Sequence, residues 1–276
     1  MLGRIAPGVA SIWARRLFLS PHRAPAPLRE TWWATDAVET TLSLADGRRL
    51  VAWRWGCGGP RVLLVHGWGG RGLQLGALAA PLVAAGYEVW TYDAPGHGRM
   101  PAQRWSLPEH RDVVALAITA LGGVEAVIAH SMGAAALTAA LDREPGLEAE
   151  RLVFMAPPAD LFAVLERFSS LTGLPMAVVD RMRLWLEARF AIRFDRMSPL
   201  AIAPSMERPL LVVHDRDDRE APAAEGAALA RAWPGAVLRT TVGLGHNRLL
   251  AEPMVVQRVV DFVGLRRMAA DRGLAA

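Results

Sequence analysis

The sequence contains no lysine, so all 31 basic residues are arginines, and they are scattered along the chain. Against them stand 27 acidic residues, which leaves a formal net charge of only +4. Proteins that bind nucleic acids usually carry a block or stripe of like charge, and this sequence has none. We therefore expect the arginines to lie on solvated faces, and we expect no nucleic-acid partner.

Cysteine is almost absent. The single Cys57, in the stretch WGCGGP, excludes an internal disulfide and has no metal-ligand partner close by in the sequence. The seven histidines fall on different segments without the short spacing of a metal site. We expect no metal and no cofactor. Because paired cysteines and a convincing export signal are also lacking, a cytoplasmic location is the default expectation.

Long apolar runs are missing too, and none reaches the roughly 20 residues of a membrane-spanning helix. A hydrophobic content of 52% and a charged content of 21% over 276 residues suit one large α/β domain. The first 29 residues hold five arginines and no acid. This pattern favours an N-terminal helix or arm over 1–30, ended by SPHRAPAP, with a transit peptide or a membrane-surface helix as alternatives.

The order of apolar runs predicts the fold class. VETTLSLADGRRLVAWRWG indicates two strands joined by Asp46 and Gly47, a pair that tolerates the positive φ of a hairpin turn. Further short apolar runs are each followed by a helical pattern, which favours a mostly parallel sheet with helices on both faces. Polar loops at the carboxyl ends of such strands carry the functional groups. These runs are 61–67, 87–93, 124–131, 151–157, 208–215 and 236–241.

The stretch VIAHSMGAAAL places Ser131 between a predicted strand and a predicted helix. Serine ordinarily serves as a turn residue or helix cap. Here Ala129 and Gly133 lie two residues to either side, and small residues at these positions permit the strained strand-to-helix turn that exposes a nucleophile. Ser131 is therefore the candidate nucleophile, with the backbone N–H of Met132 pointing to the same space.

A nucleophilic serine needs a base and an acid that orients the base. The stretch HDRDDREAP places three aspartates, Asp215, Asp217 and Asp218, after one predicted strand, and GLGHNRLL places His246 after the next. Three neighbouring carboxylates cannot all be buried against one imidazole, so we expect one to pair with His246 and the others to be solvated. The order Ser, Asp, His is that of hydrolases with a serine elbow.

Together these motifs resemble the α/β-hydrolase fold from about Thr40 onward. HGWGG, residues 66–70, is similar to the oxyanion loop of that family, which implies that the Trp68 and Met132 N–H groups bind the oxyanion. YDAPGHGRM, residues 92–100, is similar to a structural loop. Matching Pro222 to the proline of the acid loop implies Asp218 as the acid, with Asp217 as the next choice, and His246 as the general base. Ala129 stands where the family usually has glycine.

The resemblance implies that residues 157–206, a helical pattern broken at Gly173, Pro175 and Pro199, form a lid over a core of 31–156 and 207–276. Most of its apolar side chains should only pack the lid onto the core. The remainder, together with loop residues, could line an apolar acyl pocket. The candidate pocket residues are His66, Trp68, His130, Phe162, Leu165, Met176 and Trp185.

The predicted activity is hydrolysis of carboxylic esters of small to medium acyl chain through an acyl-enzyme. Thioester hydrolysis, acyl transfer, carbon–carbon bond hydrolysis and cofactor-free perhydrolysis use the same triad and stay open. A non-catalytic binding protein on the same fold is a further alternative. We expect a structural role in bracing loops, rather than a role as ligands, for His66, His97 and His130. The expected partner is a small ester, and a homodimer is an open alternative.

Overall fold

The sheet begins with the predicted antiparallel hairpin. In the computed structural model, which describes residues 7–273, strands β1 (Val38–Ser43) and β2 (Arg49–Trp55) pair along their length. Gly47 adopts φ +89° in the turn, a conformation that L-residues with a side chain rarely adopt. The Asp46 carboxylate accepts the Arg48 backbone N–H at 3.0 Å. Asp46 and Gly47 thus fix the register of the hairpin.

Eight strands form one sheet in the order β1-β2-β4-β3-β5-β6-β7-β8. Strand β2 pairs antiparallel with β4, and all later pairs are parallel. The central strands are almost entirely buried, as expected where helices cover both faces. The later strands are β3 (Arg61–Val65), β4 (Glu88–Tyr92), β5 (Val124–His130), β6 (Ala149–Met155), β7 (Leu210–Asp215) and β8 (Val237–Thr241).

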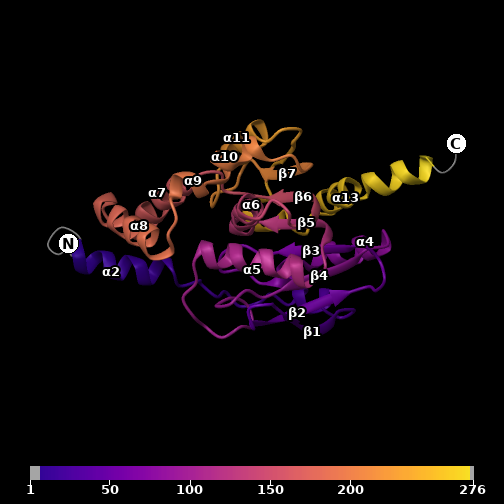
Figure 1. Cartoon of the computed structure of the whole chain (residues 1–276), viewed down its shortest axis with the longest axis horizontal. Coiled ribbons are helices and arrows are strands. Elements are labelled where there is room, and N and C mark those ends of the chain that lie inside the picture. The colour runs from indigo at the N-terminus through magenta and orange to yellow at the C-terminus, as the bar shows by residue number, and fades with distance from the viewer. Residues whose placement is uncertain (1–6, 274–276) are drawn as a thin grey trace.

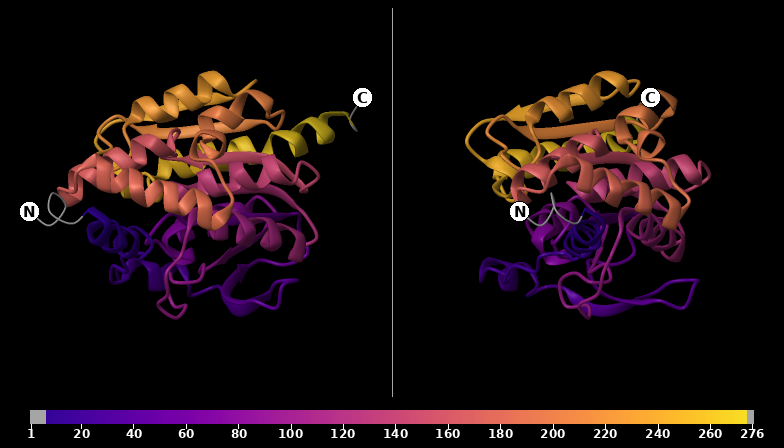
Figure 2. Two further views of the ribbon diagram at one scale, coloured as in Figure 1. Left: turned by 60° about the vertical axis from the view of Figure 1, so that its left-hand side comes forward. Right: turned by 90° about the vertical axis from the view of Figure 1, so that its left-hand side faces the viewer.

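Alternate residues of the inner strands enter two separate cores. On β3, Leu63 and Val65 face one core, while Val62 and Leu64 face the other. Helices α5 (Leu107–Ala120), α6 (Met132–Arg143) and α11 (Ala223–Ala232) pack on the first face. The 3₁₀ helix η1 (Gly72–Leu78), α4 (Ala79–Ala84) and α13 (Pro253–Gly273) cover the second. Figure 2 shows the sheet between these two layers, which confirms the predicted fold class.

A helical segment connects β6 to β7. It consists of α7 (Leu161–Thr172), α8 (Met176–Phe190), α9 (Phe194–Met197), α10 (Pro199–Ile202) and η2 (Ala203–Ser205). The Asp160 side chain caps α7 by accepting the Phe162 N–H at 2.9 Å, and Gly173 ends that helix with φ +65°. Pro175 precedes α8, where its missing N–H costs no helical hydrogen bond.

The N-terminal segment packs on this helical segment. Helix α2 (Pro7–Phe18) lies beside α8 at one end of the molecule, opposite the C-terminal helix α13 (Figure 1). Ala10 and Ala14 are buried there, and the Phe18 ring meets Phe168 edge to face at 5.1 Å between centroids. After α3 (Arg29–Trp33) the chain enters β1. None of the helices between Pro7 and Gly273 is both long and apolar enough to cross a bilayer.

Candidate active site

Ser131 occupies a strained turn between β5 and α6. Its backbone has φ +51° and ψ −125°, and its N–H donates to the Met155 carbonyl at 2.9 Å. A non-glycine residue in such a conformation costs about 1–3 kcal/mol and persists only where the surroundings impose it. A methyl group on Gly133 would lie 2.6 Å from the carbonyl oxygen of His66. The small residue after the elbow is therefore a steric requirement, as the sequence predicts.

His246 and Asp218 form a hydrogen-bonded pair. Asp218 follows β7, and His246 lies in the short helix α12 (Gly245–Arg248) that follows β8. The two residues meet at 2.7 Å between His246 Nδ1 and Asp218 Oδ2. The other carboxylate oxygen of Asp218 accepts the backbone N–H groups of Glu220 and Ala221 at 2.8 and 2.9 Å. The carboxylate is thus bonded on both oxygens and cannot rotate freely.

Burial alone would raise the pKa of Asp218, but hydrogen bonds from His214 and His246 and from the Ala221 N–H outweigh it and hold that pKa well below its usual range. Asp218 therefore stays anionic. The buried His214 ring supports it from the far side, with Nε2 3.4 Å from Asp218 Oδ2 and 2.8 Å from the Ala221 carbonyl oxygen. His214 was not among the site residues that the sequence predicts, because a histidine inside a strand gives no signal of what it faces.

Asp215 is buried, whereas we expected both neighbours of Asp218 to be solvated. That expectation is wrong for Asp215, because the carboxylate has a complete set of donors. It accepts the Thr241 hydroxyl at 2.6 Å and the backbone N–H groups of Leu244 and Asp217 at 3.0 Å each. Asp217 is exposed, as expected, and accepts the Gly243 N–H. Asp215 therefore joins the loop after β7 to the loop after β8.

The loop after β3 runs directly against the elbow. A methyl group on Gly67 would lie 2.9 Å from the Ser131 Cβ atom. The buried His66 holds this loop, since its Nδ1–H donates to the Gly67 carbonyl at 2.8 Å and its Nε2 accepts the Ala94 N–H at 3.0 Å. Burial lowers the pKa of His66 to about 4, so the ring is neutral near pH 7. Trp68, on the same loop, is half-buried.

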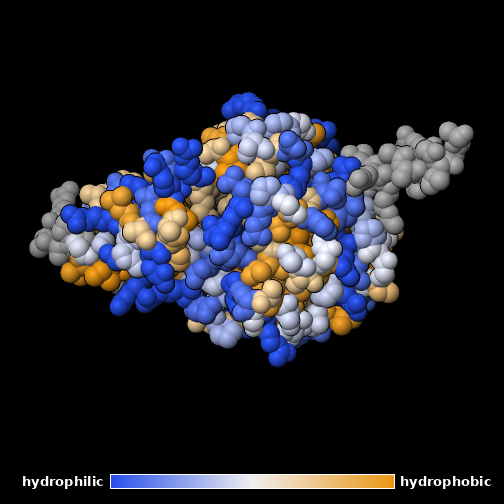
Figure 3. All heavy atoms as spheres, in the orientation of Figure 1, coloured by the Kyte–Doolittle hydropathy of each residue, from blue (hydrophilic) through white to orange (hydrophobic). Residues whose placement is uncertain are grey.

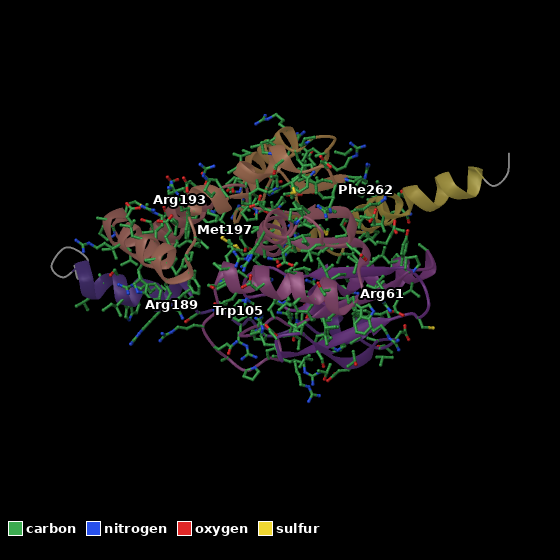
Figure 4. The ribbon with its side chains drawn as sticks, viewed as in Figure 1. Arg61, Trp105, Arg189, Arg193, Met197 and Phe262 are labelled. Atoms are coloured by element: carbon green, nitrogen blue, oxygen red, sulfur yellow. The ribbon has the colours of Figure 1, made fainter. Side chains whose placement is uncertain are left out.

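Ser131, Met132 and His246 line one cavity of about 880 Å³. The loop residue Trp68 lines it as well. Its walls are mainly apolar and come from three places: the helical segment between β6 and β7, the start of α5, and the N-terminal segment. Met197 of α9 belongs to this lining, and Figure 4 shows it where the helical segment meets the body of the molecule. The apolar side chains include Leu17, Phe18, Leu19, Leu107, Leu161, Val164, Phe168, Leu171, Leu186, Phe190, Ile192, Phe194 and Met197.

Of the seven candidate pocket residues, Trp68 and His130 line this cavity. The other five lie elsewhere around it. His66 is buried beneath the loop, Leu165 is buried among α7 and α8, and the Trp185 ring is covered by the Arg15 guanidinium at 4.7 Å; Phe162 and Met176 are exposed. The N-terminal wall was not predicted, because nothing in the sequence pattern of 1–30 indicates where that segment folds back.

A second group of imidazoles lies behind the loop after β3. The rings of His66, His97 and His110 are buried with centroids 5.1 to 5.9 Å apart. Burial lowers the pKa of His97 to about 3 and that of His110 well below its usual value. Where side chains are described, no group of three or more His, Cys, Asp or Glu residues is arranged to hold a metal ion. These rings are therefore neutral packing groups.

Residues 62–261 match the model of the alpha/beta hydrolase family. The chain belongs to the alpha/beta hydrolase family. A curated relative, pimeloyl-[acyl-carrier protein] methyl ester esterase from Aromatoleum aromaticum, is 28% identical over 239 residues, which cover 70% of this chain and 94% of the relative. This alpha/beta hydrolase therefore has an esterase among its relatives.

Solved structures share the fold of this alpha/beta hydrolase. A putative lipase from Acinetobacter baumannii superposes with a TM-score of 0.67 at 16% identity, over 88% of this chain and 95% of its own. An esterase from Pyrococcus furiosus superposes with a TM-score of 0.64 at 19% identity, over 89% of this chain and 96% of its own. At these identities the likeness establishes the fold alone.

Proposed function

We propose that this alpha/beta hydrolase is a serine esterase that cleaves carboxylic esters of small to medium acyl chain. Ser131 is the nucleophile, His246 the general base and Asp218 the acid that orients it. The observation that carries the proposal is the 2.7 Å hydrogen bond between His246 and Asp218 in the wall of the cavity that Ser131 also lines. The curated relative, named as a methyl ester esterase, supports the same bond type.

The reaction follows from the charges in the site. His246 Nε2 takes the Ser131 hydroxyl proton while Oγ attacks the ester carbonyl, and the anionic Asp218 stabilises the imidazolium that forms. The tetrahedral intermediate collapses when His246 gives the proton to the leaving alcohol, which leaves an acyl group on Ser131. His246 then takes a proton from water, and the resulting attack releases the carboxylic acid and restores the serine.

The backbone N–H groups of Trp68 and Met132 serve as oxyanion donors in this proposal. The close approach of Gly67 to Ser131 supports it, because it brings the loop after β3 to the N-terminus of α6. Donors fixed in advance by the fold stabilise the developing charge without reorganisation, and each contributes about 3 to 4 kcal/mol to lowering the barrier. His66 is the residue that positions this loop.

The segment 157–206 is the lid in this proposal, 31–156 and 207–276 are the core, and 1–30 is an arm. The apolar walls of the cavity support an uncharged acyl group as the substrate part that binds there. A series of p-nitrophenyl esters from acetate to palmitate tests the chain length. A maximum between acetate and hexanoate is expected, and activity that rises steadily to palmitate would contradict the proposed acyl range.

Labelling by a fluorophosphonate probe tests the nucleophile. The wild-type protein should be labelled and Ser131→Ala should not, because the probe reacts only with an activated serine. Ser170→Ala is the matched control, since Ser170 lines the same cavity but lies on α7, and it should be labelled like the wild type. Equal labelling of Ser131→Ala and wild type would overturn the assignment. If the protein is labelled but hydrolyses no oxygen ester, the activated serine would instead act on thioesters or carbon–carbon bonds.

A further inference from the structure

Helix α2 has two different apolar faces. Its inner face, with Ala10 and Ala14, is buried against α8. Its outer face is apolar as well but lies open to solvent. We define this outer face by four residues that share one side of the helix at the spacing i, i+3, i+4 and i+8. They are Val9, Ile12, Trp13 and Leu17, with exposed fractions of 58, 48, 62 and 42%.

An exposed apolar helix face of this kind marks an interaction surface, because large exposed side chains on a monomer are normally scattered singly. Figure 3 shows apolar residues gathered at the end of the molecule that α2 forms. Further exposed apolar side chains flank the segment, with Leu28 at 80% and Trp32 at 73%. The area that the N-terminal segment offers to a partner is therefore larger than the outer face alone.

The outer face is continuous with the cavity. Leu17 belongs both to the outer face and to the cavity lining, and Leu171, which is 87% exposed, also lines the cavity. Trp33, beside the exposed Trp32, contributes to the same lining. Apolar surface thus runs from the outside of α2 into the space that holds Ser131. A partner bound to the outer face would lie next to the route into the cavity.

The charge of the segment selects the partner. Residues 1–29 contain five arginines and no acid, and the exposed Arg16 lies among the apolar residues of the outer face. An anionic surface complements this charge, and a long arginine side chain can lie along an apolar face while its guanidinium reaches phosphate groups. A second copy of the chain would instead bring two arginine segments together, which like-charge repulsion disfavours.

We propose that the outer face of α2 docks on the surface of a bilayer that contains anionic phospholipid, with the helix in the plane of the interface. Helices that lie in a membrane interface typically carry apolar residues, including tryptophan, on one side, together with basic residues and few acids. Helix α2 has this pattern. The cavity then opens beside the lipid surface. This inference concerns where the protein works and does not depend on the ester chemistry proposed above.

Co-sedimentation with vesicles tests the proposal. Wild-type protein should pellet with vesicles of equal parts phosphatidylcholine and phosphatidylglycerol, and much less with phosphatidylcholine alone. The double variant Ile12→Gln/Trp13→Gln should partition at least about tenfold more weakly, because it removes the apolar contact without touching the cavity lining. The matched control is Val242→Gln/Met254→Gln, whose residues are 66 and 63% exposed in the loop after β8 and on α13, and it should bind like the wild type.

A second variant separates charge from apolar contact. Arg16→Gln should weaken binding to anionic vesicles several-fold at low salt. Added salt should then reduce the affinity of this variant less than that of the wild type, because one screened attraction is gone. The melting temperature of each variant checks the fold. Ser131→Ala should bind vesicles like the wild type, so a failure of the proposed ester chemistry leaves this result untouched.

Two outcomes overturn the inference. In the first, wild-type protein stays in the supernatant with anionic vesicles, or the Ile12/Trp13 double variant pellets as well as the wild type. In the second, analytical ultracentrifugation without lipid finds a wild-type dimer that the double variant converts to a monomer, and neither protein binds vesicles. That second result would assign the outer face to a contact between two copies of the chain.

Discussion

The ring of His130 donates a hydrogen bond from Nε2 to the main-chain carbonyl of His246, over 3.0 Å. His130 is the last residue of β5, directly before Ser131, so this bond joins the strand that carries the proposed nucleophile to the helix that carries the proposed base. Burial, followed by the nearby His246 ring, lowers the pKa of His130 to about 3. The ring is therefore neutral at every pH well above 3, and its hydrogen bond to the His246 carbonyl persists at those pH values.

Asp218→Asn should leave the protein folded but reduce turnover by roughly three to four orders of magnitude. An asparagine keeps an oxygen for the two backbone N–H donors, but it disfavours the imidazole tautomer that accepts the serine proton. The measurement is kcat for p-nitrophenyl butyrate. Asp217→Asn is the control and should stay within a few-fold of wild type, since Asp217 is exposed and bonds only the Gly243 N–H. A large loss in the control instead would contradict the assignment of the acid.

Gly226→Ala should act through His214. A methyl group on Gly226 would lie 2.3 Å from His214 Nδ1, so the ring that supports Asp218 must move. We expect destabilisation of about 1 to 3 kcal/mol and a lower kcat at nearly unchanged KM. In a His214→Ala background the same change should be neutral or stabilising by up to about 1 kcal/mol, because the space is free and alanine favours the helix. A double-mutant cycle by chemical denaturation measures the coupling, and additive effects would refute it.

The elbow should tolerate Ala129→Gly but not Gly133→Ala. Ala129 is fully buried, and its replacement by glycine removes one methyl group, which costs about 1 kcal/mol and keeps fluorophosphonate labelling of Ser131. A methyl group on Gly133 would meet two backbone carbonyls, those of His66 at 2.6 Å and Val65 at 3.0 Å, which cannot swing aside like side chains. Gly133→Ala should lose most labelling. Unchanged labelling rates in Gly133→Ala would be inconsistent with this close packing.

Acid should destabilise the protein below pH 6.5 through its buried imidazoles. His110 is fully buried, and burial holds its pKa well below 6.5, so the unfolded chain takes up a proton that the folded protein does not. For each such group, the free energy of unfolding therefore decreases by about 1.4 kcal/mol for each unit by which the pH is lowered. His110→Leu should reduce that slope by nearly one such increment from roughly one unit below pH 6.5 downward. Urea titrations at a series of pH values measure it, and an unchanged slope would argue against a neutral buried ring.

The fold and the centre of the site were predictable because they depend on local patterns. Short apolar runs that end in glycine or polar loops and are followed by helical patterns specify parallel strands, and small residues on either side of Ser131 specify the elbow. The carboxyl ends of parallel strands meet at one edge, which brings distant loops together. The prediction of the hairpin at Asp46 and Gly47 is confirmed for the same reason, since the turn conformation is determined by two adjacent residues.

The cavity walls were not predictable, because they depend on how whole helices are rotated. Leu186 lines the cavity while its neighbour Trp185 does not, and no local feature of α8 distinguishes them. Likewise, a run of aspartates does not reveal which carboxylate finds donors. Asp215 is buried because Thr241, at the end of the next strand, and Leu244, in the loop after it, supply donors together with the Asp217 N–H.

The hydrogen bonds that Asp215 accepts from Thr241, Leu244 and Asp217 make the loops after β7 and β8 a single mechanical unit. Transplanting either loop alone into a related scaffold would leave the Asp215 carboxylate without its donors, or the donors without their acceptor. Protein engineers who wish to exchange the proposed acid or base of this chain should therefore move both loops together, as one segment that runs from Asp215 through His246.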